Sequence, residues 1–164
     1  MFDRILLALD DSPAGEVALV FAGALAHRTG ASVHVLHVNE RIVAGNGATL
    51  RTRDEVSDLV TNAVRQLAEA GVRASGSACA STYRGVPARI VAKAADHAAD
   101  AIVLGSTRTT RGWGRLFAAQ VRERTTRLTS LPVLTAPSPL RVTALPGTGS
   151  WESRVDQALD SLLH

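Results

Sequence analysis

Short apolar runs alternate along the chain with longer segments in which apolar residues recur every three or four positions. The first run, Ile5–Leu9, contains no polar residue, which is typical of a strand buried on both faces of a sheet. Ser32–Val38 is rich in β-branched residues and predicts a second strand, and Ala101–Leu104 is another continuous apolar run. These runs predict a sheet that is covered on both sides.

Helix start and stop signals lie between the predicted strands. Ser12 and Pro13 suit the N-cap and first position of a helix, and Gly30 follows where a C-cap belongs. Thr52 and Glu55 have the spacing of a capping box and precede a second amphipathic segment. Helices therefore connect the strands.

The second half of the chain continues the alternation. Val72–Ala80 predicts a strand of small residues, Pro87 begins a third helix, Leu116–Leu128 predicts a fourth, and Pro132–Ala136 predicts a last strand. The order is βαβαβαβαβ, with connections long enough for right-handed crossovers. We therefore predict an α/β fold, a doubly wound five-stranded parallel sheet with helices on both faces.

The last part of the chain differs from the rest. We divide the sequence into a domain at 1–136, a linker with prolines and glycines at 137–149, and a short amphipathic helix at 150–164. Trp151 lies on the apolar face of this helix, which is expected to dock on its own domain, on a second copy or on a protein partner.

Composition narrows the class of protein. The chain has 164 residues, 46% of them hydrophobic, enough for one sizeable core. No apolar run reaches the roughly 18 residues of a membrane span, and the first residues do not resemble a signal peptide. Cys79 is the single cysteine, which excludes a disulfide framework. We expect a cytoplasmic protein.

Positive charge is concentrated in one segment. The formal net charge is +3, all but one of the 18 basic residues are arginine, and residues 105–128 hold six arginines against Glu123 alone. This distribution favours a local anion site over a nucleic-acid surface. Aromatic residues make up only 4% of the chain, which leaves little stacking surface for single-stranded nucleic acid, so we expect no nucleic-acid partner. We also expect no membrane contact, because the polar face of the predicted C-terminal helix is net acidic.

Two strand ends carry candidate chemistry. The loop after Leu104 is rich in glycine and arginine and predicts an anion cradle, with an ordinary tight connection as the alternative. The pair Asp10–Asp11 follows the first strand, as the Mg²⁺-binding pair of a phosphoacceptor domain would, but no aspartate ends the third strand and no lysine ends the fifth. The glycine-rich loop that an ATP-pyrophosphatase would have after the first strand is also absent. The acidic pair otherwise only solvates a strand end.

No metal centre or catalytic constellation is predicted. We place His34 and His37 on one face of the second strand, where two histidines could bind a metal, but no third ligand lies nearby in the sequence. No serine, histidine and acid pattern indicates nucleophilic catalysis. We therefore expect no catalytic and no metal-binding residues.

Several segments together resemble the universal stress protein family, across roughly residues 2–136. They are ILLALDDSP at the start, VHVLHV in the second strand, GVPA before the third helix, ADAIVLGS in the fourth strand and LPVLTA at the end. The resemblance implies the doubly wound fold predicted above. It also implies a homodimer formed by antiparallel pairing of the edge strand Leu131–Ala136.

For nucleotide-binding members, the resemblance implies an adenine nucleotide such as ATP or AMP at the strand ends, with Mg²⁺ only as its companion. Asp10 would meet the adenosine and the Val38 backbone the adenine edge, while Gly105 and the loop beyond would hold phosphates. The residues that the resemblance implies for the nucleotide are Ala8, Asp10, Val38, Gly105, Ser106, Arg108, Arg111, Gly112, Ala119 and Gln120.

This chain departs from the family's phosphate pattern of Gly, two residues, Gly, nine residues, then Gly-Ser or Gly-Thr. Arg108 stands at the second glycine, and Ala119 and Gln120 replace the last pair when one insertion is allowed. Three hypotheses follow: a non-enzymatic stress-response protein that binds a nucleotide, an interaction and dimerisation module that binds no ATP, and a slow nucleotide hydrolase.

Overall fold

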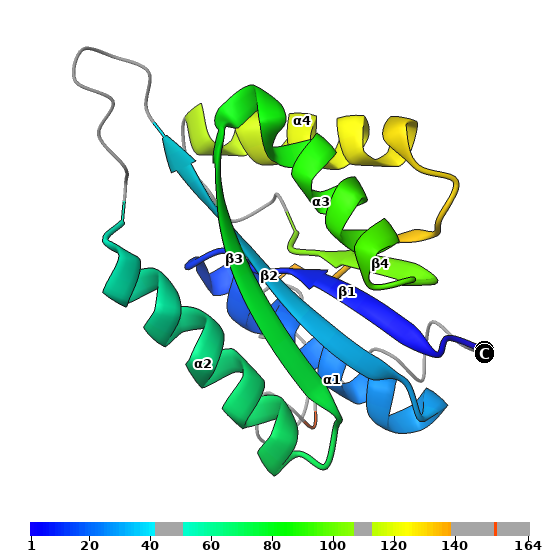
Figure 1. The fold of residues 1–164 in the computed structure, drawn as a ribbon. Coiled ribbons are helices and arrows are strands. Elements are labelled where there is room, and N and C mark those ends of the chain that lie inside the picture. The colour runs from blue at the N-terminus through cyan, green and yellow to red at the C-terminus, as the bar shows by residue number, and fades with distance from the viewer. Residues whose placement is uncertain (42–50, 107–112, 139–152, 154–164) are drawn as a thin grey trace.

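The computed structural model describes residues 1–41, 51–106, 113–138 and 153 (Figure 1). In chain order the elements are β1 (Arg4–Ala8), α1 (Pro13–Thr29), β2 (Ser32–Arg41), α2 (Arg53–Glu69), β3 (Ala74–Thr82), the 3-10 turn η1 (Tyr83–Gly85), α3 (Val86–Asp96), β4 (Ala101–Leu104), α4 (Trp113–Leu128) and β5 (Val133–Thr135). The predicted alternation of strands and helices is confirmed.

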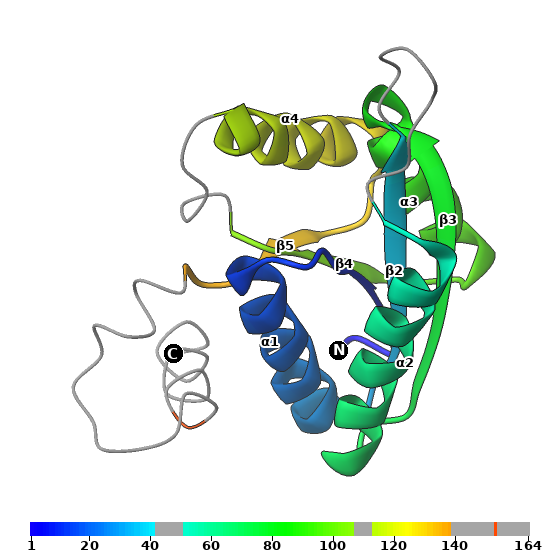
Figure 2. The ribbon, with the colours of Figure 1, turned by 90° about the vertical axis from the view of Figure 1, so that its left-hand side faces the viewer.

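The five strands form one parallel sheet with the order β3-β2-β1-β4-β5. The chain runs outward from β1 through β2 to β3 and then crosses to β4 on the other side of β1. The strand order therefore reverses between β1 and β4, where open α/β sheets form their crevices. Figure 2 shows α4 and α1 on opposite sides of β4 and β5, and the predicted doubly wound fold is confirmed.

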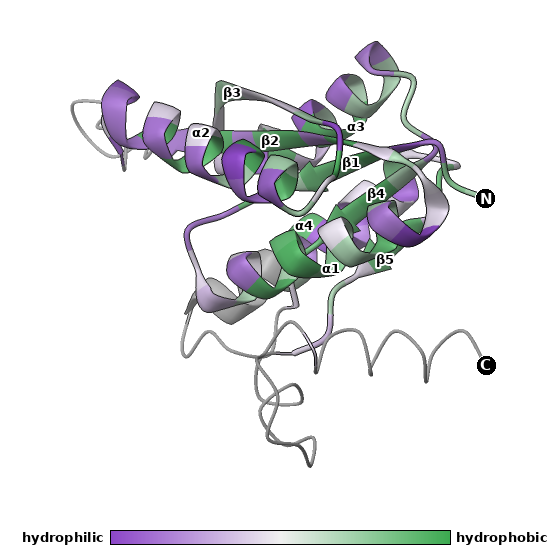
Figure 3. Cartoon of the chain, turned by 90° about the horizontal axis from the view of Figure 1, so that it is seen from below, coloured by the Kyte–Doolittle hydropathy of each residue, from purple (hydrophilic) through white to green (hydrophobic). Residues whose placement is uncertain are grey.

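Side chains of the central strands alternate between two apolar layers. Leu7 and Val35 belong to the layer under α1 and α2, whereas Leu6 and Leu36 belong to the layer under α3. Alternation is expected because successive strand residues point to opposite faces. Figure 3 shows hydrophobic strands between helices whose polar residues face outward, α2 most clearly. Burial of both faces explains why Ile5–Leu9 contains no polar residue.

The predicted helix signals work as expected. The Ser12 hydroxyl accepts a hydrogen bond from the Gly15 N–H at 3.1 Å, and Gly30 ends α1 with φ of 75°. Thr52 and Glu55 form both bonds of the capping box at the start of α2, at 3.2 and 2.8 Å. These local contacts satisfy backbone N–H groups that the first helical turn leaves unpaired.

Several boundaries differ from the predicted ones. The strand predicted at Val72–Ala80 is β3, Ala74–Thr82, because Gly71 turns the chain with φ of 77° and the Val72 N–H still bonds to the Leu67 carbonyl at the end of α2. As a result, pairing with β2 begins only at Ala74.

Other elements also shift: β1 is Arg4–Ala8 rather than Ile5–Leu9, and β2 continues to Arg41 beyond the predicted Val38. The helix α4 begins at Trp113 rather than at the predicted Leu116, and η1 precedes the predicted helix start at Pro87. The last strand is shorter than the predicted Leu131–Ala136, although the Ala136 N–H still donates to the Leu104 carbonyl at 2.9 Å. These differences lie at the ends of helices and strands, where few hydrogen bonds hold the terminal residues and boundaries vary by a residue or two.

The prediction that His34 and His37 share a strand face is wrong. They are three positions apart on β2, so the alternation of side chains places them on opposite faces. Both ring nitrogens of His34 lie 2.8 Å from hydroxyls, those of Ser75 and Ser77, and the His34 ring stacks on His97 with 3.5 Å between ring centroids. The two histidines therefore cannot hold one metal ion.

The junction of β1 and α1 is closely packed. A Cβ atom on Gly15 would lie 2.5 Å from Asp10 Oδ1 and closer still to the Asp10 carbonyl oxygen. No side chain fits between the end of β1 and the first turn of α1. Glycine at position 15 is therefore a steric requirement of this junction.

Most of the predicted linker and C-terminal helix, at 139–152 and 154–164, lies outside the described residues. None of the helices in the described ranges has the length and apolar character needed to cross a bilayer.

We expect the buried His34 to make the protein less stable in mild acid. Burial, and then His97 and Lys93, lower the pKa of His34 from 6.5 to about 4. Below pH 6.5 the unfolded chain gains a proton that folded His34 does not accept, so the free energy of unfolding should fall by up to about 1.4 kcal/mol per pH unit down to pH 4. Urea denaturation of wild type and His34→Gln between pH 7 and 5 measures this, and the variant should show the flatter dependence. An equal pH dependence of the free energy of unfolding in the two proteins would contradict a lowered pKa of His34.

We expect Gly15→Ala to destabilise the β1–α1 junction. The added methyl group must displace Asp10, so the free energy of unfolding should fall by about 1–3 kcal/mol, the usual cost of overpacking. Gly23→Ala is the matched control on the same helix, because its methyl would meet only the flexible Leu67 side chain, at 3.1 Å. Urea denaturation compares the two variants, and similar losses would show that the junction has room for a methyl group.

Candidate functional site

A cavity of about 310 Å³ lies where β1, β2 and β4 end, between these strand ends and the helices α3 and α4. Its apolar lining includes Ala8, Leu36, Val38, Ile90, Leu104 and Val121. Its polar lining includes Asp10, Ser12, Glu40, Tyr83, Ser106 and Arg122. We call it the strand-end cavity. An apolar pocket with a few convergent polar groups is the usual form of a small-molecule site.

Asp10 is fixed by the start of α1. The Ser12 hydroxyl donates to Asp10 Oδ1 at 2.6 Å while it accepts from the Gly15 N–H, so one serine holds both the helix cap and the carboxylate. The neighbouring Asp11 instead forms an ion pair with Arg51. Of the acidic pair that ends β1, Asp10 borders the cavity.

Val38 presents backbone groups to the cavity. The ladder between β1 and β2 ends at Ala8 and Leu36, and the Leu9 N–H makes a last bond to the Leu36 carbonyl at 2.9 Å. Backbone groups of alternate residues face the same neighbouring strand, so those of Val38 face the place where β1 has already turned into α1. They can pair with the edge of a ligand there.

Gly105 brings the end of β4 close to α1. A Cβ atom at this position would lie 3.2 Å from the Ala14 carbonyl oxygen, tighter than most side-chain contacts. Gly105 and Ser106 therefore border the cavity directly beside the first turn of α1. Arg108, Arg111 and Gly112, the next residues that the resemblance assigns to phosphate, lie outside the described residues.

One side of the cavity is acidic. Burial raises the pKa of the Glu40 carboxyl, the nearby Asp10 carboxylate raises it further, and His37 acts in the opposite direction. Burial, and then Glu40, also raise the pKa of the Tyr83 hydroxyl. A ligand group that donates hydrogen bonds without carrying negative charge suits this side.

Tyr83 links the two elements η1 and α4, which contribute residues to opposite sides of the cavity. Its hydroxyl donates to Gln120 Oε1 at 2.9 Å and so joins η1 to α4. Gln120 and Ala119, both assigned to phosphate by the resemblance, are not among the described residues that border the cavity. The side-chain oxygen of Gln120 is used by the fold.

Neither histidine of β2 borders the cavity. His34 is held by two serines on β3, and His37 donates through Nδ1 to the Leu9 carbonyl at 2.9 Å. Within the described ranges, no three His, Cys, Asp or Glu side chains are grouped closely enough to hold a metal ion.

The structure thus places Ala8, Asp10, Val38, Gly105 and Ser106 around one cavity. Ser12, Glu40, Tyr83 and Arg122 also border it, although the resemblance assigns them no role in nucleotide binding. Glu40 carries a sequence signal, since it follows Val38 by two positions and shares its strand face. For Arg122, the only sequence signal is that it belongs to the basic segment 105–128. Its position beside the cavity depends on how α4 packs, which the sequence does not show.

Comparisons with known proteins agree with this geometry. The model of the universal stress protein family matches residues 1–137. No curated protein matches the sequence with significant similarity.

Solved structures with the same fold were also found. A universal stress protein from Archaeoglobus fulgidus matches with a TM-score of 0.64 and 24% identity over 84% of this chain and 100% of that one. A universal stress protein from the same organism, in complex with dAMP, matches with a TM-score of 0.61 and 20% identity over 84% of this chain and 98% of that one. A universal stress protein family protein from Arabidopsis thaliana, with AMP bound, matches with a TM-score of 0.58 and 15% identity over 89% of this chain and 97% of that one.

The match to the family model extends over β1 to β5 and includes every described residue that borders the strand-end cavity. The structural matches share the fold in which this cavity lies. This chain therefore belongs to the universal stress protein family.

Proposed function

We propose that this protein binds an adenine nucleotide in the strand-end cavity and acts as a non-enzymatic, regulatory protein of the stress response. The observation that carries the proposal is the convergence of Asp10, Val38, Gly105 and Ser106 on one cavity. The resemblance assigns these residues to the adenosine and to the phosphates. They come from three strand ends that the fold alone brings together.

The cavity suggests how the nucleotide lies. The base packs against the apolar lining and pairs with the backbone of Val38, the ribose hydroxyls donate to Asp10, and the phosphates lie toward Gly105 and Ser106. Mg²⁺ enters this proposal only as a companion of the phosphates.

Two of the matched structures support the choice of ligand. The Archaeoglobus fulgidus protein is in complex with dAMP, and the Arabidopsis thaliana protein has AMP bound. Their shared fold provides the same crevice at the carboxyl ends of the strands.

Binding without catalysis is supported by how the reactive side chains are used. Both ring nitrogens of His34 and the Nδ1 atom of His37 make contacts within the fold, and burial raises the pKa of the Cys79 thiol. A thiol with a raised pKa is a poorer nucleophile at neutral pH.

We expect AMP and ATP at millimolar concentration to raise the melting temperature. A ligand that binds only the folded state at one hundred times its Kd adds about 2.7 kcal/mol, which corresponds to a rise of several degrees in a chain of this size. Asp10→Asn should weaken AMP binding roughly fivefold, because it keeps an acceptor for Ser12 but replaces a charged acceptor by a neutral one.

Asp58→Asn is the matched control, since Asp58 is exposed on α2 and its replacement changes the net charge equally. Differential scanning fluorimetry and isothermal titration calorimetry give the two readouts. Unchanged melting of the wild type with both nucleotides would favour the interaction module, and release of ADP from ATP would favour the hydrolase.

We also propose that β5 pairs with its copy in a second chain. β5 is an edge strand, with β4 as its only neighbour in the described sheet. The Pro132 carbonyl and the Ala136 N–H bond to β4, so the backbone groups of Val133 and Thr135 face the open edge. Antiparallel pairing with a second copy would satisfy them in a closed two-fold contact.

We expect Val133→Pro to convert a dimer to a monomer. Proline removes an N–H that faces outward and leaves the bonds to β4 intact, so the domain should stay folded. Val133→Ala keeps the N–H and should remain dimeric. Sedimentation velocity at micromolar concentration distinguishes the two states, and a monomeric wild type would refute pairing through this edge.

A further inference from the structure

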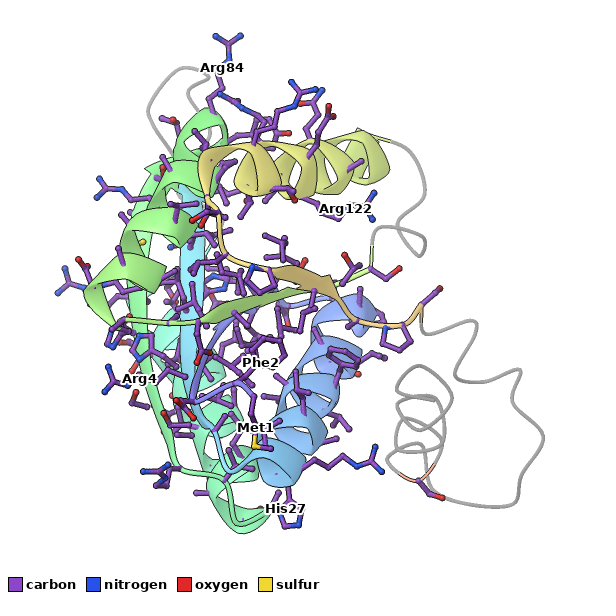
Figure 4. The ribbon with its side chains drawn as sticks, turned by 90° about the vertical axis from the view of Figure 1, so that its right-hand side faces the viewer. Met1, Phe2, Arg4, His27, Arg84 and Arg122 are labelled. Atoms are coloured by element: carbon purple, nitrogen blue, oxygen red, sulfur yellow. The ribbon has the colours of Figure 1, made fainter. Side chains whose placement is uncertain are left out.

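Arg122 brings a positive charge to the strand-end cavity from α4. It borders the cavity together with Gly105 and Ser106, which come from the end of β4. Figure 4 shows its side chain on the side of α4 that faces β4 and β5. It is the one basic residue among the described residues that border the cavity.

The guanidinium of Arg122 has no ion-pair partner among the described residues. On the same helix Arg127 is held by Glu123 at 2.6 Å. The carboxylates of the cavity belong to Asp10 and Glu40, and neither is within ion-pair distance of Arg122. An arginine that borders a cavity without a carboxylate partner is free to bind an anion there.

The turn of α4 before Arg122 is fixed by another contact. Gln120 accepts the hydrogen bond from Tyr83 on the opposite wall, which anchors this turn to η1. Ala119 and Gln120 stand where the family's phosphate pattern has glycine and serine. Arg122, two residues after Gln120 on α4, can therefore supply the phosphate contact that Ala119 and Gln120 do not.

We propose that Arg122 binds a phosphate group of the nucleotide through its side chain, in place of the missing glycine and serine. The inference rests on the proposed function. A planar guanidinium offers two parallel N–H donors to two phosphate oxygens, so one arginine can replace several backbone N–H groups.

The charges of the cavity then fix the class and direction of the ligand. The acidic side formed by Asp10 and Glu40 repels an anion and accepts hydrogen bonds from hydroxyl or amino groups. Arg122, on α4, attracts the anionic end. The ligand is a nucleoside phosphate whose phosphate lies toward α4, and its affinity depends on that phosphate.

The experiment compares AMP with adenosine by isothermal titration calorimetry on the full chain. Arg122→Gln should weaken AMP binding at least about tenfold, the scale of a hydrogen-bonded charge pair, and should leave adenosine binding within about twofold of wild type. Arg122→Lys should recover part of the loss. AMP binding by Arg122→Gln should also depend less steeply on salt concentration than that of wild type.

Arg127→Gln is the matched control, because it removes the same charge from the same helix at a residue that does not border the cavity. It should bind AMP like wild type. Equal AMP affinities of Arg122→Gln and wild type would overturn the role of Arg122 while nucleotide binding stands. A wild type that binds neither AMP nor adenosine would overturn both the proposed function and this inference.

Discussion

The close contact between the first turn of α1 and the ends of β1 and β4 is the constraint on which the rest depends. Gly15 leaves room for Asp10, and Gly105 lets the end of β4 approach the Ala14 carbonyl. The chain leaves β1 toward α1 on one face and leaves β4 toward α4 on the other. Diverging connections from neighbouring strands open a crevice between them, so the packing that closes the core also forms the cavity.

The two ends of the sheet serve different purposes. At the amino ends, polar contacts close the fold: the Asp100 carboxylate accepts from the N–H groups of Asp3 and Arg4 at 2.7 and 3.2 Å, and His34 stacks on His97. At the carboxyl ends, polar groups of Asp10 and Arg122 border open space. Polar residues that are consumed by the fold stabilise it, whereas those that remain available around a cavity can bind a ligand.

The polarity of the cavity is a property of several elements together. Glu40 extends from β2, Asp10 from the end of β1, and Arg122 from α4. Burial raises the pKa of the Glu40 carboxyl and the nearby Asp10 carboxylate raises it further, so this side of the cavity disfavours an additional anion. In the proposed binding mode, this placement of charge selects both the kind of ligand and its direction, in a site whose phosphate loop departs from the family pattern.

The sequence by itself determined the order of the elements, the helix caps at Ser12 and Thr52, and the strand ends that border the cavity. These features follow from local chemistry: apolar runs for buried strands, hydroxyl side chains for helix starts, and the rule that parallel strands share one ligand-binding edge. Only the tertiary structure decided the hydrogen-bond partners of the two β2 histidines, the pairing of Tyr83 with Gln120 and the approach of Arg122. Those contacts join residues from different elements, and no local pattern encodes the angle at which a helix packs on a sheet. That angle places Arg122 beside the cavity.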